Sequence, residues 1–185
     1  MKSLARIAAA GVLVLAPVFA FAAGPWTGMY VGIQAGINSV SADGLSTEQG
    51  MTAGAFGGYN FQLADHFVLG GDAFWDWNQS KSHNVNGSNR KVDTGTNVYG
   101  VDVLAGVPLG QDGSWMPFAK VGYGWADPTG DMSGGTQDAM RYGAGIAWRL
   151  SDSLSLFGQY MYQDFGSNIG NYTNNNFTVG ASLHF

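Results

Sequence analysis

The side chains best suited to catalysis are those of three histidines, His66, His83 and His184. Ser182 stands two positions before His184, so both side chains would share one face of an extended strand. Hydrolysis by such a pair needs the hydroxyl, the imidazole base and a third group that orients the base. The only glutamate, Glu48, falls in an expected loop, while His66 falls in an expected turn and His83 in another loop. We therefore predict no catalytic residue and no enzymatic activity.

Ligands for a metal ion or a cofactor are equally sparse. The chain has no cysteine, and its 29 glycines lie within strand-like runs rather than in a phosphate-binding loop. Asp127 and Asp131 flank Pro128-Thr129-Gly130, a sequence typical of a loop turn. The 13 acidic residues outnumber the 8 basic ones, and no basic stripe is present. We expect no metal site, no cofactor and no nucleic-acid partner.

Five further charged residues occupy the polar positions of runs in which polar and apolar residues alternate: Asp72, Asp76, Asp102, Lys120 and Arg141. If those runs are the strands of a narrow barrel, all five side chains point into its lumen. A lone buried ion costs several kcal/mol, so charges in such a space must pair. We predict a cluster of Asp72, Lys120 and Asp102, with Arg141 beside Asp76, that plugs the lumen. The alternative is a water-filled lumen in which each charge is hydrated separately.

The elements that position these residues follow from composition and periodicity. Charged residues are only 11% of the 185 residues and aromatic residues reach 14%, whereas soluble domains are about a quarter charged. A glycine-rich soluble sandwich and a membrane barrel both fit. Alternation with a period of two predicts eight strands, each near the length that a tilted membrane strand needs. They span 29–38, 51–61, 67–77, 98–107, 115–125, 140–149, 154–163 and 177–185.

The connections and the aromatic residues favour the membrane barrel. Connections alternate between long polar segments, such as Asn78 to Asn97, and short turns, such as Ser151-Asp152-Ser153. Outward-facing aromatic residues fall at two heights around an apolar band, as they do at the two surfaces of a bilayer. Tyr30 and Pro117 do not fit, because the register turns Tyr30 inward and gives Pro117 an outward strand position. A shifted boundary or a bulge would explain them.

The first residues indicate export. Lys2 and Arg6 precede an apolar run to Ala22, and Ala20-Phe21-Ala22 is a typical cleavage signature. We expect residues 1–22 to be a signal peptide and residues 23–185 to form one outer-membrane barrel domain. The alternative is an uncleaved membrane anchor. The expected fold is an eight-stranded antiparallel transmembrane β-barrel with four long extracellular loops and three short periplasmic turns.

The segment Trp26-Thr27-Gly28-Met29-Tyr30-Val31-Gly32 is similar to the W-T-G-x-Y-x-G start of a known family, and the terminal strand ends on Phe185 as in that family. The chain resembles the small outer-membrane barrels of Gram-negative bacteria, the opacity-protein and porin-family surface-antigen group. The resemblance implies that Phe185 is read by the barrel-assembly machinery. Ser182 and His184 resemble the pair of the lipid A deacylase family, but they would point into the barrel near its periplasmic end, away from such a substrate.

The expected function is therefore that of a monomeric surface protein in the outer membrane, surrounded by lipid. Its role would be structural, or adhesion to a host or surface ligand through the extracellular loops. A narrow pore for small solutes is the first alternative, and a lipid A-modifying enzyme is the second.

Overall fold

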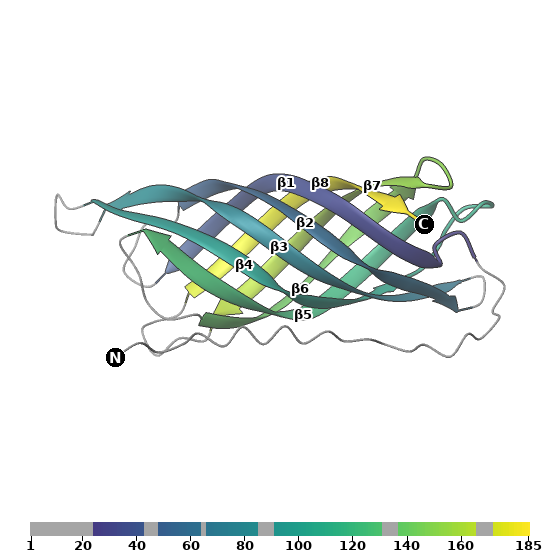
Figure 1. Cartoon of the computed structure of the whole chain (residues 1–185), viewed down its shortest axis with the longest axis horizontal. Coiled ribbons are helices and arrows are strands. Elements are labelled where there is room, and N and C mark those ends of the chain that lie inside the picture. Colours follow the sequence, from purple (N-terminus) through teal and green to yellow (C-terminus); the bar gives the residue numbers. More distant parts are fainter. Residues whose placement is uncertain (1–23, 43–47, 64–65, 85–90, 131–136, 166–171) are drawn as a thin grey trace, which may run out of the picture.

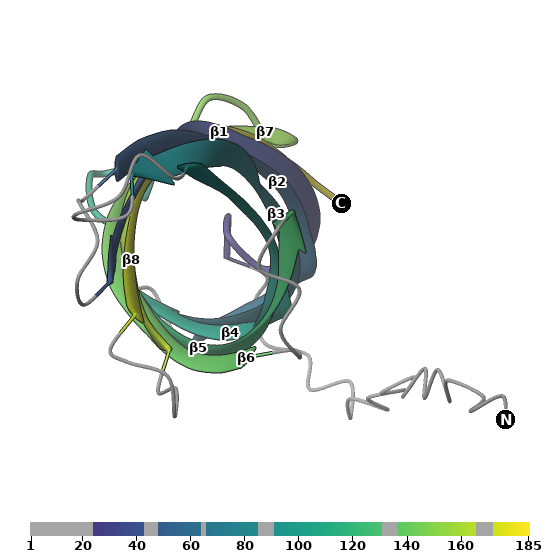
Figure 2. The ribbon, with the colours of Figure 1, turned by 90° about the vertical axis from the view of Figure 1, so that its left-hand side faces the viewer.

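The chain folds into one closed barrel of eight antiparallel strands (Figures 1 and 2). This computed structural model describes residues 24–42, 48–63, 66–84, 91–130, 137–165 and 172–185. Each strand pairs with its neighbours in the sequence, and β8 returns to pair with β1. The strands are β1 (Gly28–Ala42), β2 (Glu48–Leu63), β3 (Phe67–Asn84), β4 (Lys91–Gly106), β5 (Trp115–Gly130), β6 (Gln137–Arg149), β7 (Leu154–Phe165) and β8 (Tyr172–His184).

The predicted register is confirmed in every strand. On β3, Asp72, Phe74 and Asp76 are buried in the lumen, while Ala73 and Trp75 between them are exposed on the outside. The same alternation holds around the barrel, because successive side chains of a strand point to opposite faces of the sheet. The lumen therefore holds the polar and charged strand residues together with two apolar clusters, and the outer surface carries the exposed large apolar residues. No helix in the described part of the chain is long and apolar enough to cross a membrane.

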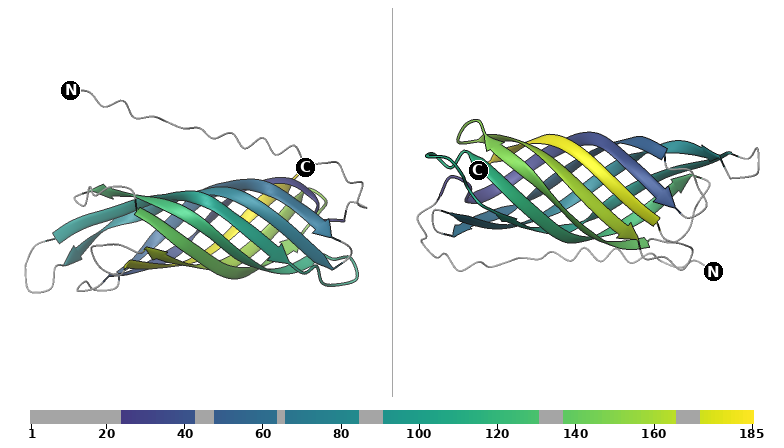
Figure 3. Two further views of the ribbon diagram at one scale, coloured as in Figure 1. Left: turned by 90° about the horizontal axis from the view of Figure 1, so that it is seen from below. Right: turned by 180° about the vertical axis from the view of Figure 1, so that it is seen from behind.

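The strands are longer than predicted, and most of the added residues lie at the end of the barrel where β1 ends and β8 begins (Figures 1 and 3). The prediction that 78–97 is one long loop was wrong: β3 continues to Asn84 and β4 begins at Lys91. Polar residues form these strand ends, because outside an apolar layer the backbone ladder needs no apolar side chains. Residues 43–47, 85–90, 131–136 and 166–171, which contain the tips of the four long connections, lie outside the described residues.

Three smaller predictions change for the same reason. His83 lies on β3 rather than in a loop. Asp127 and the Pro128-Thr129-Gly130 sequence belong to β5 and do not form a turn, whereas Asp131 lies outside the described residues. Asn174 and Asn176 belong to β8 and are buried inside the barrel. Polar strand ends have the composition of loops, so these residues were predicted to lie outside the strands.

At the other end, the β4–β5 and β6–β7 connections are tight turns, as predicted. Between β4 and β5, Gly110 and Gly113 have φ angles of 91° and 65°, which favour glycine. In the same turn the carboxylate of Asp112 accepts a hydrogen bond from the backbone N–H of Ser114 at 3.2 Å. That bond holds the pKa of the Asp112 carboxyl below its usual value.

Neither a bulge nor a shifted boundary is needed for Tyr30 and Pro117. Tyr30 does point inward, and its hydroxyl donates a hydrogen bond to Asp72 at 2.9 Å. Pro117 stands just beyond the last β4–β5 pair of the strands, and its carbonyl accepts the Val107 N–H at 3.0 Å. An N–H group at position 117 would bond only with the residues that follow β4. The hydrogen bond that proline cannot make therefore costs the barrel little stability.

Candidate functional site

The middle of the lumen holds an ionic network formed by the five charged residues singled out in the sequence. The ammonium group of Lys120 lies 2.6 Å from Asp72 Oδ2 and 3.9 Å from Asp102 Oδ2. The guanidinium of Arg141 lies 3.1 Å from Asp102 Oδ1 and 3.6 Å from Asp76 Oδ2. Asp102 therefore joins the two basic residues into one network. The sequence indicated Arg141 beside Asp76 but did not indicate its nearer contact with Asp102.

The strand register explains why the network needs a basic residue between Asp72 and Asp102. Asp72 and Asp102 lie directly opposite each other on β3 and β4. Two like charges in that relation repel, so Lys120 from β5 separates them and pairs with both. Gly54 and Gly122 supply the room, because a Cβ on either would collide with the carboxylate of Asp76 or Asp102.

Uncharged side chains extend the network across the lumen. Gln34 Nε2 donates to Asp76 at 2.6 Å, and Gln159 Nε2 donates to Gln34 Oε1 at 2.8 Å. The guanidinium of Arg141 also lies 3.6 Å from the centre of the Phe74 ring, which favours a cation on its face. The network thus joins side chains from six strands across the middle of the lumen.

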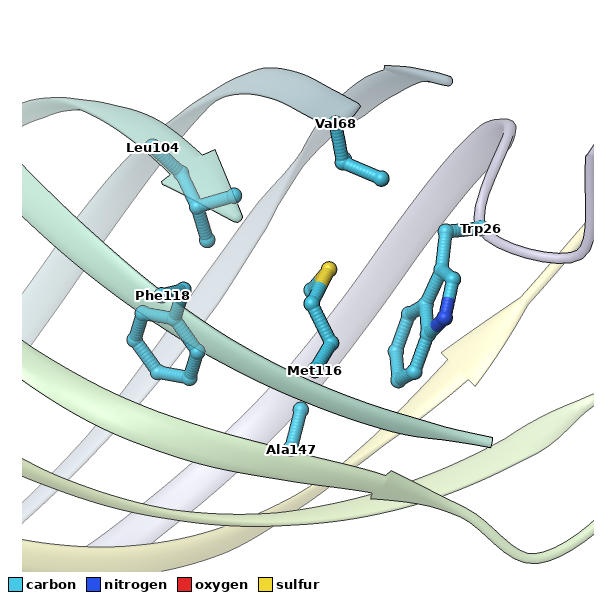
Figure 4. Packing of buried hydrophobic residues seen from close by; sticks show 6 residues of the cluster. All are labelled: Trp26, Val68, Leu104, Met116, Phe118 and Ala147. Atoms are coloured by element: carbon cyan, nitrogen blue, oxygen red, sulfur yellow. The ribbon is translucent and has the colours of Figure 1, made fainter. Parts of the chain in front are cut away.

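The end of the lumen where β1 begins and β8 ends is filled by apolar side chains (Figure 4). Trp26 precedes β1, and its indole is buried among five side chains that reach inward from four strands. These are Val68, Leu104, Met116, Phe118 and Ala147. Sequence reasoning used Trp26 only as part of a motif. Its position just before an alternating run gave no sign of an inward turn.

Ser182 and His184 lie inside the barrel near this apolar end. Ser155, which sequence reasoning did not single out, joins them: its Oγ lies 2.8 Å from Ser182 Oγ and 2.8 Å from His184 Nε2. The other ring nitrogen, Nδ1, has no hydrogen-bond partner among the described residues. A base of this kind needs an orienting group there, so the cluster lacks one part of a hydrolytic triad. His66 is exposed in the β2–β3 turn, and the side chains of Glu48 and His83 lie outside those described.

The end of β8 is held against the start of β1. The backbone N–H of Phe185 donates to the carbonyl of Met29 at 2.9 Å, while its side chain is 78% exposed. Gly28 has a φ of 140°, and a Cβ there would collide with the carbonyl oxygen of Phe185. The glycine of the W-T-G sequence therefore makes room for the last residue of the chain. The ring of Phe185 therefore lies on the outer surface.

A hairpin formed by the ends of β3 and β4 projects beyond the rest of the barrel (Figure 3). The β2–β3 ladder ends at Thr52 and Asn78, and the β4–β5 ladder ends at Thr94 and Gly130. Beyond these rungs β3 and β4 pair only with each other, up to Asn84 and Lys91. We call the described residues beyond these rungs, 79–84 and 91–93, the projecting hairpin. Among the described residues, its rungs from Ser82 onward have no further strand paired on either side.

Comparisons with known proteins agree with this architecture. A family model described as "Outer membrane protein beta-barrel domain" matches residues 7–185. A search among curated proteins found no match. Neisserial surface protein A is similar in fold, with 16% identity and a TM-score of 0.65 over 86% of this chain and 98% of that one.

Two further solved structures share the fold. Ail, the attachment invasion locus protein of Yersinia pestis, has 15% identity and a TM-score of 0.60, over 86% of this chain and 99% of Ail. Ail has also been solved in complex with the heparin analogue sucrose octasulfate. The outer membrane enzyme PagL has 14% identity and a TM-score of 0.50, over 83% of this chain and 99% of PagL. At such identities the likeness shows the fold alone, and that fold serves both surface proteins and an enzyme.

Proposed function

The chain belongs to the outer membrane protein β-barrel family, and on that premise we propose that it acts at the cell surface through the projecting hairpin. It lies in the outer membrane of Gram-negative bacteria as a closed eight-stranded barrel. One observation carries the proposal: the β3–β4 ladder continues from Lys81 and Thr94 to Asn84 and Lys91 after both neighbouring ladders have ended. A hairpin so placed can contact another molecule without disturbing the barrel.

The charges of the hairpin favour an anionic partner. After the expected loss of residues 1–22, six basic residues remain. Lys81 and Lys91 belong to this hairpin, and Arg90 directly precedes Lys91 in the sequence. Lys120 and Arg141 are committed to the lumen, and Arg149 caps the β6–β7 turn at the opposite end. Positive charge on the outer side is therefore concentrated in one hairpin of an acidic protein. Sulfated polysaccharides suit such a surface, since each ion pair with a sulfate releases counterions, and Ail provides a precedent for this ligand class on the same fold.

Binding to immobilised heparin tests both parts of the proposal. The wild-type barrel should bind, and binding should weaken as salt rises, because the attraction is electrostatic. A variant in which Asn-Gly replaces residues 82–93 should fold but lose binding. Arg149→Gln, which removes one charge at the other end, should bind like the wild type. Equal binding by the shortened variant would remove the hairpin from the proposal, and absence of wild-type binding would remove the polysaccharide.

The two alternatives would use the lumen. We propose that the ionic network closes it, which makes a pore for solutes the weaker hypothesis, and that the protein is not an enzyme. Support comes from the paired charges at mid-lumen and from the missing orienting group beside His184. A lipid A mass spectrum from expressing cells tests the enzymatic alternative: a mass change that Ser182→Ala abolishes would establish it. The terminal Phe185 is proposed as the contact for the barrel-assembly machinery, and the barrel is proposed to be monomeric.

A further inference from the structure

Trp26 fills the lumen at the end where β1 begins and β8 ends, apart from the ionic network. The segment before β1 turns into the ring and is visible there in purple in Figure 2. The Trp26 side chain is 1% exposed. Its indole N–H donates to the carbonyl of Gly113 at 2.7 Å, and its backbone N–H donates to Gln62 at 3.2 Å. Thr27 adds one bond, its hydroxyl oxygen accepting from the Gln62 N–H at 3.1 Å. Trp26 is thus tied to β2 and to the β4–β5 turn across the mouth.

A small chamber lies between Trp26 and the ionic network. Its volume is about 50 Å³, which is room for a few water molecules. Trp26 lines it together with Lys120 and Tyr30 of the ionic network and its surroundings. The polar residues Ser155, Ser182 and His184 complete this part of the wall. These polar groups distinguish it from a dry cavity, which apolar side chains alone would line.

Two oxygen atoms in the chamber wall need a ligand. Asn60 is 3% exposed and Gln159 is 6% exposed, yet Asn60 Oδ1 and Gln159 Oε1 have no hydrogen-bond partner among the described residues. A buried amide oxygen without a partner is unfavourable, because it has lost its hydrogen bonds with water. Both oxygens are acceptors, and water can donate to each while it accepts from the Lys120 ammonium group.

We propose that this chamber binds water and that Trp26 is its door toward the periplasm. The lumen is then closed twice in series, by an apolar door and by an ionic plug, with a hydrated space between them. Trp26 stands outside the strand ladders, in the short segment that precedes β1. The proposal concerns the lumen and is independent of the projecting hairpin.

The absence of cysteine from the sequence makes the door directly testable. Ser182→Cys places one thiol in the chamber wall with little change in size. The folded barrel, in detergent micelles, is exposed to a small charged methanethiosulfonate reagent, and labelling is followed by mass. With Trp26 present, the thiol should be protected. In the Trp26→Ala background, labelling should be at least tenfold faster, because the ionic plug is unchanged and only this entrance has opened.

A matched control is Trp115→Ala in the Ser182→Cys protein, because Trp115 lies near the same end but on the outer face. It should leave the thiol protected. Heat-modifiable gel mobility establishes that each variant is folded, and Trp26→Phe should keep the door closed if Trp26→Ala does not fold. Equal labelling rates with and without the Trp26 ring, whether fast or slow, would overturn the proposal. So would protection that Trp115→Ala removes as effectively as Trp26→Ala.

Discussion

At the scale of single residues, the energetics of the barrel interior centre on the pairing of Lys120. Lys120→Met leaves Asp72 and Asp102 opposite each other without the ammonium group between them. Breaking a buried ion pair in this way costs about 3–5 kcal/mol. The double variant Asp72→Asn with Lys120→Met removes both charges and should be the more stable of the two. Urea unfolding followed by tryptophan fluorescence measures the difference in free energy of unfolding between the two variants. If the double variant loses the sum of what the two single variants lose, Asp72 and Lys120 are not paired.

The second prediction at this scale concerns Phe185. Because its ring is exposed and its backbone makes the bond to Met29, Phe185→Ala should leave the folded barrel as stable as the wild type. The yield of assembled barrel in cells should nevertheless fall, since the resemblance assigns the ring to the assembly machinery. Gly28→Ala is the contrasting variant, because its Cβ collides with the Phe185 carbonyl and should destabilise the folded barrel itself. Equal yields of Phe185→Ala and wild type, compared by heat-modifiable mobility, would refute the assignment.

The sequence predicted which charges point inward but only some of their contacts. Alternation along a strand is sufficient to place Asp102 and Arg141 on the inner face. Which of them meet depends on the stagger between strands, because tilted strands bring residues of unrelated sequence position to one level. The contact of Arg141 with Asp102, and the joining of Ser155 to Ser182 and His184, depend on that stagger. No local pattern contains this information.

At the scale of elements, the eight strands and their faces were predictable, but their lengths were not. The apolar positions identify only the part of each strand inside the apolar layer. β3 and β4 continue as a polar ladder, which is indistinguishable from a loop by composition. The inward turn of the segment that carries Trp26 was missed for the opposite reason, since an apolar residue beside a strand looks like part of its outer face.

The projecting hairpin yields a topological prediction. Trypsin added to intact cells should cut after Lys81, Arg90 or Lys91, while the remaining barrel stays folded, because its ladders do not depend on the hairpin. Mass spectrometry of the fragments locates the cuts. Cleavage that appears only after the outer membrane is breached would mean that the barrel is inserted with its two ends exchanged.

The outer face of β4 yields another prediction. Val103 is 58% exposed and lies between the two levels of outward-facing aromatic residues. Trp77 belongs to the level nearer the projecting hairpin. Val103→Lys should therefore destabilise the barrel by roughly 2–4 kcal/mol in lipid, and Trp77→Lys should cost less, because a charge near the interface can reach water. Unfolding in lipid vesicles compares the two. If Val103→Lys lowers the free energy of unfolding equally in detergent and in lipid, this face of the barrel does not lie in the membrane.

At the scale of the whole molecule, the double closure of the lumen predicts little steady ion conductance. Purified wild type in planar bilayers should show no stable open level, because side chains fill an eight-stranded interior. Trp26→Ala alone should also remain closed, since the ionic plug still spans the lumen. A stable ohmic channel in the wild type would contradict the closed lumen and would favour the pore over the surface role as the function.

The seam between β1 and β8 has a consequence for how the molecule forms. Residues at opposite ends of the sequence pair there, from Tyr30 with His184 to Ala42 with Tyr172. Contacts of such high sequence separation form slowly, because the whole intervening chain must be ordered before they can be gained. Until the last strand arrives, β1 presents an unpaired edge, which invites association with other chains. The barrel thus passes from an aggregation-prone open sheet to an edge-free cylinder in one final event.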